Sequence, residues 1–259
     1  MLFRSLNHVA FAGMLLAGRV AILWSYMALS RSSLAEKTRV VRRVVPEEQR
    51  DRESHWPLYH LVVFFEVLLI CSLGLMDDIP LFNLTGILVM LVFHVTFIEF
   101  IYYWVHYAMH FRTIYKAMHK HHHRSVVTEP TTSITFLWFE HAIYDIMFAL
   151  PVLFILYLGV GSYAAIALYS WGFDVFNYTG HSNFEFFPRA WMKSDWKWII
   201  YTPSYHSIHH TNPYHNYCLF FPWTDFLFGS IHVKTQERFE KAFDPPLAPA
   251  PTDFEADAE

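Results

Sequence analysis

Five long apolar runs constrain the fold of this chain more than any other feature. They cover residues 9–29, 58–75, 81–104, 142–158 and 162–176. Crossing a bilayer takes about 20 residues of helix, and only helices or closed barrels satisfy the backbone there. The last two runs are short, and they fit a two-span hairpin or a pair of partly embedded helices equally well. The sequence therefore predicts an all-α integral membrane bundle of four to five helices.

Composition supports this interpretation. Hydrophobic residues make up 54% of the chain, aromatic residues 19% and charged residues only 16%, which departs from the usual balance of a soluble domain. The net charge of −4 shows no basic excess, so no nucleic-acid partner is expected. Only two cysteines are present, Cys71 and Cys218, and no CxxC occurs. A disulfide scaffold and a cysteine-held iron–sulfur cluster are therefore not expected.

The orientation follows from the loop at residues 31–53. Its seven cations are Arg31, Lys37, Arg39, Arg42, Arg43, Arg50 and Arg52. Cytoplasmic loops carry such an excess of Lys and Arg, so we place this loop in the cytoplasm. Counting spans from there returns the ends of the third and fifth runs to the same side. The membrane itself is either a bacterial inner membrane or the endoplasmic reticulum.

Three histidine motifs stand near the cytoplasmic ends of these runs. An H-x3-H motif and two H-x2-H-H motifs comprise His106 and His110, then His119, His122 and His123, and finally His206, His209 and His210. On a helix, residues three and four apart leave the same side and can reach a common point. Neutral imidazole is the commonest metal ligand, and eight imidazoles are too many for one ion. The motifs therefore predict a two-metal site.

Other histidines are weighed individually. His181 returns to the same side of the membrane before His206, and we expect it to be a ninth ligand. His121 points about 150° away from the face of its neighbours on a helix, which excludes it. His215 is either a neighbour of the ligands or a loop residue. The isolated histidines are expected to be ordinary hydrogen-bonded residues: His8, His55, His60, His94, His141 and His232.

The metal and its chemistry are less constrained. A nitrogen-rich, thiolate-free site suits iron, zinc or copper. Activation of O2 beside an alkyl chain needs a redox metal and a dry pocket, which favours two iron ions, with zinc as a substitute on overexpression. Aromatic residues beside the first motif could line such a pocket or face the membrane: Phe97, Phe100, Tyr102, Tyr103 and Trp104. No G-x-G-x-x-G occurs, so for such a site we expect a separate reductase or small electron carrier to dock on the cytoplasmic face and supply electrons.

Two other functions compete with O2 activation at a two-iron site. A membrane electron carrier with bis-histidine haem would use histidines inside the spans, such as His60 and His94. The other is a zinc-dependent membrane hydrolase or metal-handling protein, for which H-E-x-x-H is absent and no glutamate stands within a histidine motif as general base.

The motifs, in this order and after these spans, resemble the fatty acid hydroxylase/sterol desaturase superfamily of membrane di-iron oxygenases. Locally, SVVTEP at 125–130, GHSNFE at 180–185, YTPSYHSIHHT at 201–211 and the closing residues Asn216, Tyr217, Asp225, Gly229 and Ser230 are most similar to the amino-terminal part of plant wax-synthesis aldehyde decarbonylases. The resemblance implies nine metal ligands: His106, His110, His119, His122, His123, His181, His206, His209 and His210. Some lipid hydroxylases have a further histidine where this chain has Asn177, so the second metal would have either fewer nitrogen ligands or a solvent ligand here.

The resemblance also implies an activity and a domain plan. The activity would be O2-dependent hydroxylation or desaturation of a long-chain lipid or sterol, with cleavage of a fatty aldehyde to an alkane as the alternative. Residues 1–243 would form one oxygenase domain, with the metals in a cytoplasmic helical cap. Residues 244–259 are Pro/Ala-rich and then acidic, and we expect them to be disordered.

Overall fold

The computed structural model describes residues 2–244, and within that range every regular element is a helix. The only β-type pairing there is an isolated bridge between Arg39 and Phe184. The all-α prediction is confirmed for these residues. The tail expected to be disordered lies, from residue 245 on, outside the described residues.

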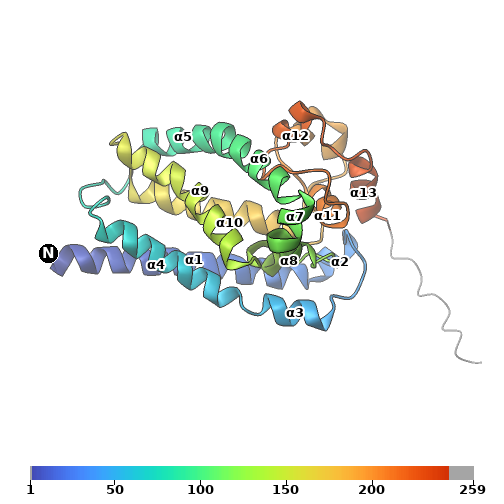
Figure 1. Ribbon diagram of the computed structural model, residues 1–259, viewed down its shortest axis with the longest axis horizontal. Helices are drawn as coiled ribbons and strands as arrows, with labels where there is room; N and C mark the ends of the chain where they lie inside the picture. The colour runs from blue at the N-terminus through green and yellow to red at the C-terminus, as the bar shows by residue number, and fades with distance from the viewer. Residues whose placement is uncertain (1, 245–259) are drawn as a thin grey trace, which may run out of the picture.

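Long helices form a bundle that runs along the long axis of the molecule (Figure 1). They are α1 (Leu2–Ser30), α4 (Trp56–Ser72), α5 (Leu84–Phe93), the π-helix η1 (His94–Ile98), α6 (Glu99–Met109), α9 (Trp138–Tyr157) and α10 (Tyr163–His181). The segment from α5 through η1 to α6 is one continuous helical stretch. The π-turn inside it is a feature that often occurs near functional sites.

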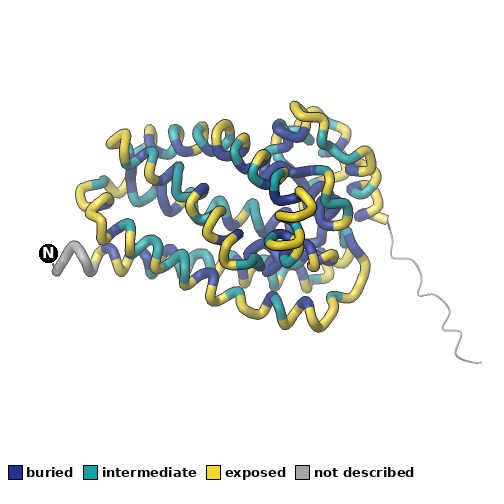
Figure 2. The backbone as a smooth tube through the Cα atoms, in the orientation of Figure 1, coloured by how far each residue is buried: buried dark blue, intermediate teal, exposed yellow. Residues whose placement is uncertain are grey.

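Short helices gather at one end of this bundle (Figure 1). They are α2 (Ser33–Lys37), α3 (Glu47–Glu53), α7 (Arg112–Ile114), the π-helix η2 (Tyr115–His119), α8 (Lys120–His123), the 3₁₀-helices η3 (Pro130–Ile134), η4 (Trp191–Lys193) and η5 (Asp195–Trp198), and α11 (Pro203–Thr211), α12 (Trp223–Phe228) and α13 (Thr235–Ala242). Figure 2 shows the buried residues concentrated where α6, α8 and α11 meet.

Within residues 2–244, four helical segments are long and apolar enough to cross a membrane: Asn7–Ser30, Glu47–Ser72, Leu84–Met109 and Trp138–Tyr157. These segments indicate a membrane protein, as predicted. The fifth apolar run forms α10, which is not among them. Because α10 packs against α1, α5, η3 and α11, it lies inside the bundle, and its polar residues Asp174 and Thr179 are buried against protein. A helix enclosed by other helices can be less apolar than one that faces lipid.

The backbone of α5 closely approaches the turn between α9 and α10. Gly86 in α5 lies against the turn after α9, where a Cβ on residue 86 would stand 2.0 Å from the carbonyl oxygen of Val160. That neighbour is backbone, so it has no side-chain freedom with which to move away. Glycine is therefore required at this position for α5 to reach the turn.

We expect Gly86→Ala to destabilise the fold by forcing α5 away from this turn. The matched control is Gly172→Ala in α10, where a Cβ would meet nothing within 4 Å. In a helix interior, alanine is more favourable than glycine by about 0.5–1 kcal/mol, so the control should not lower stability. Thermal unfolding in detergent distinguishes the two variants. Equal melting temperatures for them would contradict the packing described.

Candidate metal centre

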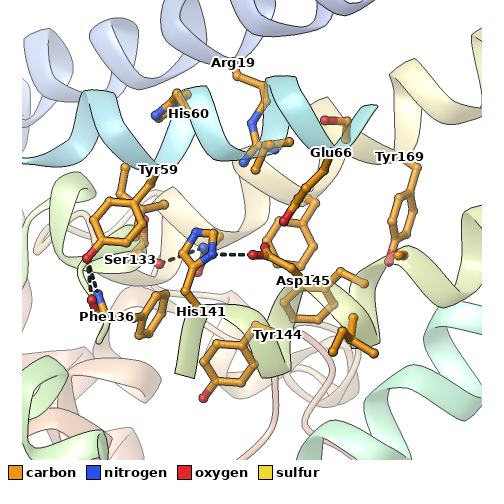
Figure 3. Close-up of a pocket in the computed structure, with 18 of the residues that line it drawn as sticks. Arg19, Tyr59, His60, Glu66, Ser133, Phe136, His141, Tyr144, Asp145 and Tyr169 are labelled. Carbon is orange, nitrogen blue, oxygen red and sulfur yellow. Dashed lines mark hydrogen bonds and ion pairs between the residues drawn. The ribbon is translucent and has the colours of Figure 1, made fainter. Parts of the chain in front are cut away.

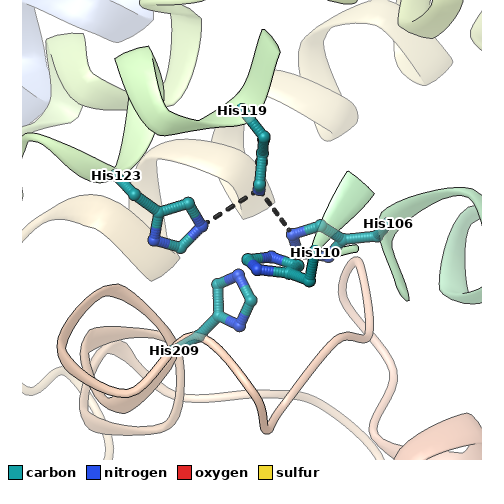
Figure 4. A group of neighbouring side chains, drawn as sticks. All are labelled: His106, His110, His119, His123 and His209. Atoms are coloured by element: carbon teal, nitrogen blue, oxygen red, sulfur yellow. Dashed lines mark hydrogen bonds between the residues drawn. The ribbon is translucent and has the colours of Figure 1, made fainter. Parts of the chain in front are cut away.

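The nine predicted histidines converge at the end of the bundle where the short helices gather, although they are spread over more than 100 positions of the chain. They form two groups, in each of which one nitrogen per residue lies within 4.8 Å of the others. The first group is His106, His110, His119, His123 and His209 (Figure 4). The second group is His122, His181, His206 and His210. All nine side chains are buried.

Helical spacing explains how the histidines of each motif are distributed between the two groups. His106 lies in the last turn of α6 and His110 ends that helix, so this i,i+4 pair enters the first group together. In each H-x2-H-H motif, the i,i+4 pair enters one group and the i+3 residue enters the other. Positions i+3 and i+4 differ by about 100° around a helix, so one motif can serve two points.

The two H-x2-H-H motifs are therefore used crosswise. His119 and His123 belong to the first group, and the i+3 residue between them, His122, belongs to the second. On α11 the arrangement is reversed, because His206 and His210 belong to the second group and His209 to the first. Each motif thus joins the two groups, and neither group can form without both segments.

Hydrogen bonds fix the proton positions in the first group. His106 Nδ1 donates to the carbonyl oxygen of Tyr217 at 2.8 Å, and His119 Nδ1 donates to the buried Glu140 carboxylate at 2.5 Å. The Nε2 atom of each neutral ring is then an unprotonated acceptor. These two Nε2 atoms lie 3.1 Å apart. Two lone pairs cannot bond each other, and a shared cation satisfies both.

In the second group the tautomer of one ring is fixed, and whichever nitrogen of His206 carries the proton, its buried Nδ1 has no partner among the described residues. His181 Nδ1 donates to the Asn177 carbonyl at 2.8 Å, which leaves its Nε2 unprotonated and 2.9 Å from Nε2 of His206. Several other ring nitrogens of the two groups are buried without a hydrogen-bond partner in the described part of the chain, including both nitrogens of His110 and of His210. Buried polar atoms without partners are rare and costly. An imidazole-lined metal site would satisfy them.

The distances between the ligand nitrogens suit transition-metal ions. A metal–imidazole bond of about 2.0–2.1 Å allows two ligand nitrogens on one ion to lie up to about 4.2 Å apart. The groups span 4.8 Å, so a contraction of a few tenths of an ångström on each side would close either one around an ion. The first group offers five imidazoles and the second four. Asn177, where some relatives have histidine, donates instead to the Ser133 carbonyl at 3.1 Å.

Burial keeps these imidazoles neutral. Desolvation, followed by repulsion from His106, lowers the pKa of His110 to about 2. Desolvation likewise lowers the pKa of His119, His122 and His123 well below the usual value, and the neighbouring histidines add to the effect. Neutral imidazole is the form that binds metal, so the site is prepared for metal at neutral pH.

Supporting groups that the sequence analysis missed hold the rings in place. Glu140 is fully buried and orients His119. Such a carboxylate partner fixes the ring orientation and raises the basicity of a histidine ligand. The sequence does give one signal of this role, because Glu140 is a carboxylate that stands just before the apolar run at residues 142–158. The carbonyl of His215 has a similar role, because it accepts the Nδ1–H of His209 at 2.7 Å.

Asp225 organises the loop that supplies two of these carbonyls. Its carboxylate accepts the N–H groups of Tyr217 and Cys218 at 2.8 and 2.7 Å and the hydroxyls of Tyr205 and Ser230 at 2.8 and 2.6 Å. This arrangement gives a physical role to the closing motif residues of the sequence. They position the 215–218 loop beneath His106 and His209.

Two further carboxylates fix the other motif loops. Glu53 accepts hydrogen bonds from Ser125, Thr131 and Thr132 at 2.7–2.8 Å and so anchors the SVVTEP loop after the first H-x2-H-H motif. Glu185, in GHSNFE, accepts the N–H of Ser204 at 2.7 Å and ties the His181 segment to α11.

The remaining candidates lie elsewhere. His121 is half-buried and belongs to neither group, and His215 contributes its carbonyl but not its ring. The six isolated histidines are also outside both groups among the described residues. Of the five aromatics expected near the first motif, Tyr102 lines the cavity beside the site and Tyr103 is buried with its hydroxyl 3.0 Å from that of Ser230. Exposed on the outside are Phe97, Phe100 and Trp104.

A cavity of about 360 Å³ runs from the histidine groups into the bundle. His106 and His119 of the first group and His122, His181 and His206 of the second line one end of it. Apolar and aromatic side chains form most of its wall, including Tyr144, Phe148 and Phe173. Both groups therefore face one mostly apolar space.

Because the groups are separate, single substitutions should remove metal selectively. We expect His209→Ala to weaken metal binding in the first group and His122→Ala in the second, each lowering the metal content toward one ion per chain. His121→Ala is the control and should retain both ions. Metal analysis of the purified variants tests this. If His121→Ala lost metal while His209→Ala retained it, the assignment of the two groups would be wrong.

The neutral imidazoles also make stability depend on pH. In the unfolded chain they bind protons below about pH 6.5, whereas in the fold they stay neutral, so the unfolded state binds more protons and the free energy of unfolding falls as pH falls. Each such histidine contributes about 1.4 kcal/mol per pH unit below that range. We expect the metal-free protein to melt at a clearly lower temperature at pH 5.5 than at pH 7.5. Identical melting temperatures would contradict the buried neutral cluster.

Comparisons with known proteins agree with this arrangement. Residues 91–230 match the family model described as "Fatty acid hydroxylase". The chain is 37% identical over 224 residues to "Very-long-chain aldehyde decarbonylase GL1-4" of Oryza sativa subsp. indica, covering 84% of this chain and 36% of that protein. It is 36% identical over 225 residues to "Very-long-chain aldehyde decarbonylase CER1" of Arabidopsis thaliana, covering 85% and 36%. The chain thus spans about a third of the length of these relatives.

No solved structure matches the chain. The family match covers the segment that carries all nine histidines and their supporting carboxylates except Glu53. The relatives align over most of the chain. On these grounds, the chain belongs to the fatty acid hydroxylase family.

Proposed function

We propose that this protein is a membrane di-iron enzyme that uses O2 to hydroxylate or desaturate a long-chain lipid or sterol. One observation carries the proposal: both all-histidine groups open onto a single, mostly apolar cavity inside a bundle of membrane-type helices. Nitrogen ligands without thiolate suit iron, and an apolar cavity suits an alkyl chain. Zinc could occupy the same ligands during overproduction.

Different residues of the chain would have different roles in this reaction. The nine histidines would hold two iron ions, which would supply the redox chemistry that attacks an unactivated C–H bond with O2. Glu140 and the loop carbonyls hold the rings in one tautomer and orientation. Aromatic walls such as Phe148 and Phe173 bind the alkyl chain and exclude water. Hydroxylation consumes one O2, two electrons and two protons per C–H bond and yields an alcohol and water.

Cleavage of a fatty aldehyde is the second candidate. It is favoured by the plant relatives named very-long-chain aldehyde decarbonylases, which are 36–37% identical to this chain. This chain aligns with only about a third of each of those proteins, so the whole activity of a relative does not transfer directly. The same ligands and cavity would serve either reaction. The product therefore distinguishes the two.

The haem alternative has less support. His60 Nδ1 donates to the Trp56 carbonyl at 3.1 Å, and His94 Nδ1 lies 3.0 Å from the Tyr169 hydroxyl. At Nε2, His60 contacts the Tyr178 hydroxyl at 3.4 Å, and His94 has no hydrogen-bond partner among the described residues. An electron carrier would also leave the nine clustered histidines without a role.

A separate electron carrier would dock on the cytoplasmic side. The cationic loop at residues 31–53 lies at the end of the bundle that holds the histidines (Figure 1), and the positive-inside rule puts that end in the cytoplasm. Four exposed cations follow at intervals of four along the segment that supplies His119, His122 and His123. They are Arg112, Lys116, Lys120 and Arg124. Such a stripe would attract an acidic carrier to a position close to the metals.

Reversing two of these charges should slow carrier-dependent turnover. We expect Lys116→Glu with Lys120→Glu to lower the rate with an acidic ferredoxin-type carrier, and to reduce its dependence on salt. Lys234→Glu with Lys241→Glu, on and beside α13, is the matched control. Product formation with a small chemical reductant should be unchanged in both variants. Equal loss with the carrier and with the chemical reductant would place the stripe outside electron delivery.

Lipid profiling tests the function itself. Cells with and without the protein should differ in a lipid that gains one oxygen atom or loses two hydrogens, and the change should require O2. Loss of one carbon would instead establish the aldehyde reaction. His122→Ala, which removes a ligand, is the negative control. Iron-loaded protein that consumes no O2 with fatty acids, aldehydes or sterols would contradict the proposal.

A further inference from the structure

A cluster of ionisable side chains lines the cavity away from the histidine groups. Arg19 comes from α1, Glu66 from α4, and His141 and Asp145 from α9. Figure 3 shows these four side chains directed into the same space from three helices. All four lie within segments long and apolar enough to cross a membrane. The metal site does not use any of them.

Such groups are costly in a membrane segment. Insertion of a charged side chain near the centre of a span costs about 2.5–3.5 kcal/mol on translocon scales, and such residues usually serve a function. Part of the cluster has a structural explanation, because Arg19 pairs with Asp174 of α10 at 2.9 Å. That pair balances one positive and one negative charge. It leaves Glu66, Asp145 and His141 to be explained.

These three residues form a group of their own. Asp145 pairs with His141, and the Glu66 carboxyl lies beside that of Asp145 (Figure 3). Two neighbouring carboxyl groups in a buried site favour holding a proton, because two adjacent negative charges repel each other. The set therefore presents both donors and acceptors to the cavity. Arg19 adds a further donor, since its buried Nε has no hydrogen-bond partner among the described residues.

The carboxyl part of the cluster lies at a definite distance from the histidine groups, whereas His141 follows Glu140 directly and pairs with Asp145 from that side. On α9, Asp145 is five residues beyond Glu140, the partner of His119, which corresponds to about 7.5 Å of helix. On α10, Asp174, the partner of Arg19, is seven residues before His181, or about 10.5 Å. An extended chain advances about 1.2 Å per bond, so the separation corresponds to roughly six to nine bonds.

The cavity continues past the cluster into an apolar end. Leu15, Ile70, Met76, Val152 and Ile166 line that end. A plain hydrocarbon lying along the cavity would bury the polar cluster without giving it a partner, which is unfavourable. A chain with an oxygen-bearing group at the level of the cluster would match all three regions.

We propose that Glu66, Asp145, His141 and Arg19 form a polar subsite that binds a hydroxyl or carbonyl group of the lipid substrate, six to nine bonds from the carbon that reacts. The inference rests on the proposed function, since it concerns the substrate of the same site. The apolar end of the cavity holds the remainder of the chain. The subsite thereby selects oxygenated lipids and sets the position of attack.

Binding to the protein measures the subsite independently of turnover. The probes are octadecane and two octadecanols, with the hydroxyl at the chain end or in mid-chain. We expect the protein to bind the alcohols more tightly than octadecane, and Glu66→Gln or Asp145→Asn to remove about ten- to hundredfold of that preference, as expected for one hydrogen bond to a charged group. Affinity for octadecane should be unchanged in both variants. Glu47→Gln, an exposed residue of α3, is the matched control.

Turnover then tests the spacing. With iron-loaded protein, moving the hydroxyl along the chain should move the oxidised carbon by the same number of positions, as located by fragment masses. Equal affinity for alcohol and alkane, or oxidation at a carbon counted from the chain end, would overturn the subsite. Alcohol-selective binding without any oxidation would keep the subsite and contradict the proposed function. Variants must retain wild-type metal content, so that an effect on the ligands is not mistaken for one on the subsite.

Discussion

Unprotonated imidazole nitrogens held face to face in a dry interior are the interaction on which the rest of this structure depends. His106 and His119 oppose each other at 3.1 Å, and His181 and His206 at 2.9 Å. In the first pair both rings have their proton committed to a carbonyl or carboxylate on the opposite side, and in the second pair His181 does. Without a cation the first contact would be repulsive, and ring nitrogens of both groups would stay buried without a partner among the described residues. The carboxylates Glu140, Asp225, Glu53 and Glu185 hold the surrounding segments so that the contacts persist.

The bundle gives this site its chemical setting. Helices α6, α9 and α10 deliver histidines or their partners at one end and enclose the cavity with the rest of their length. Because α10 is surrounded by other helices, it can carry Asp174 and His181 on one element. One helix thus links the metal site with the ionisable cluster deeper in the cavity. Under the proposed function, the geometry of oxidation and the choice of substrate would both depend on the same few helices.

Much of this could be predicted from the sequence, because helix spacing and hydropathy are local properties. The membrane-type helices and the convergence of the nine histidines follow from apolar runs and from i,i+3 and i,i+4 repeats. The crosswise use of the two H-x2-H-H motifs could not be predicted in this way, because it depends on how α8 and α11 face each other. Likewise, the bond from His119 to Glu140 and the loop held by Asp225 are tertiary contacts, which the periodicity of the sequence does not reveal. The reduced hydropathy of α10 becomes intelligible only once its neighbours are known.

The most direct test of the account is an anaerobic titration of ferrous iron into the metal-free protein, followed by Mössbauer spectroscopy. The account predicts saturation at two ions per chain in two nitrogen-rich environments, one for the group of five histidines and one for the group of four. Saturation at a single ion, or a spectrum dominated by haem or sulfur ligation, would contradict it.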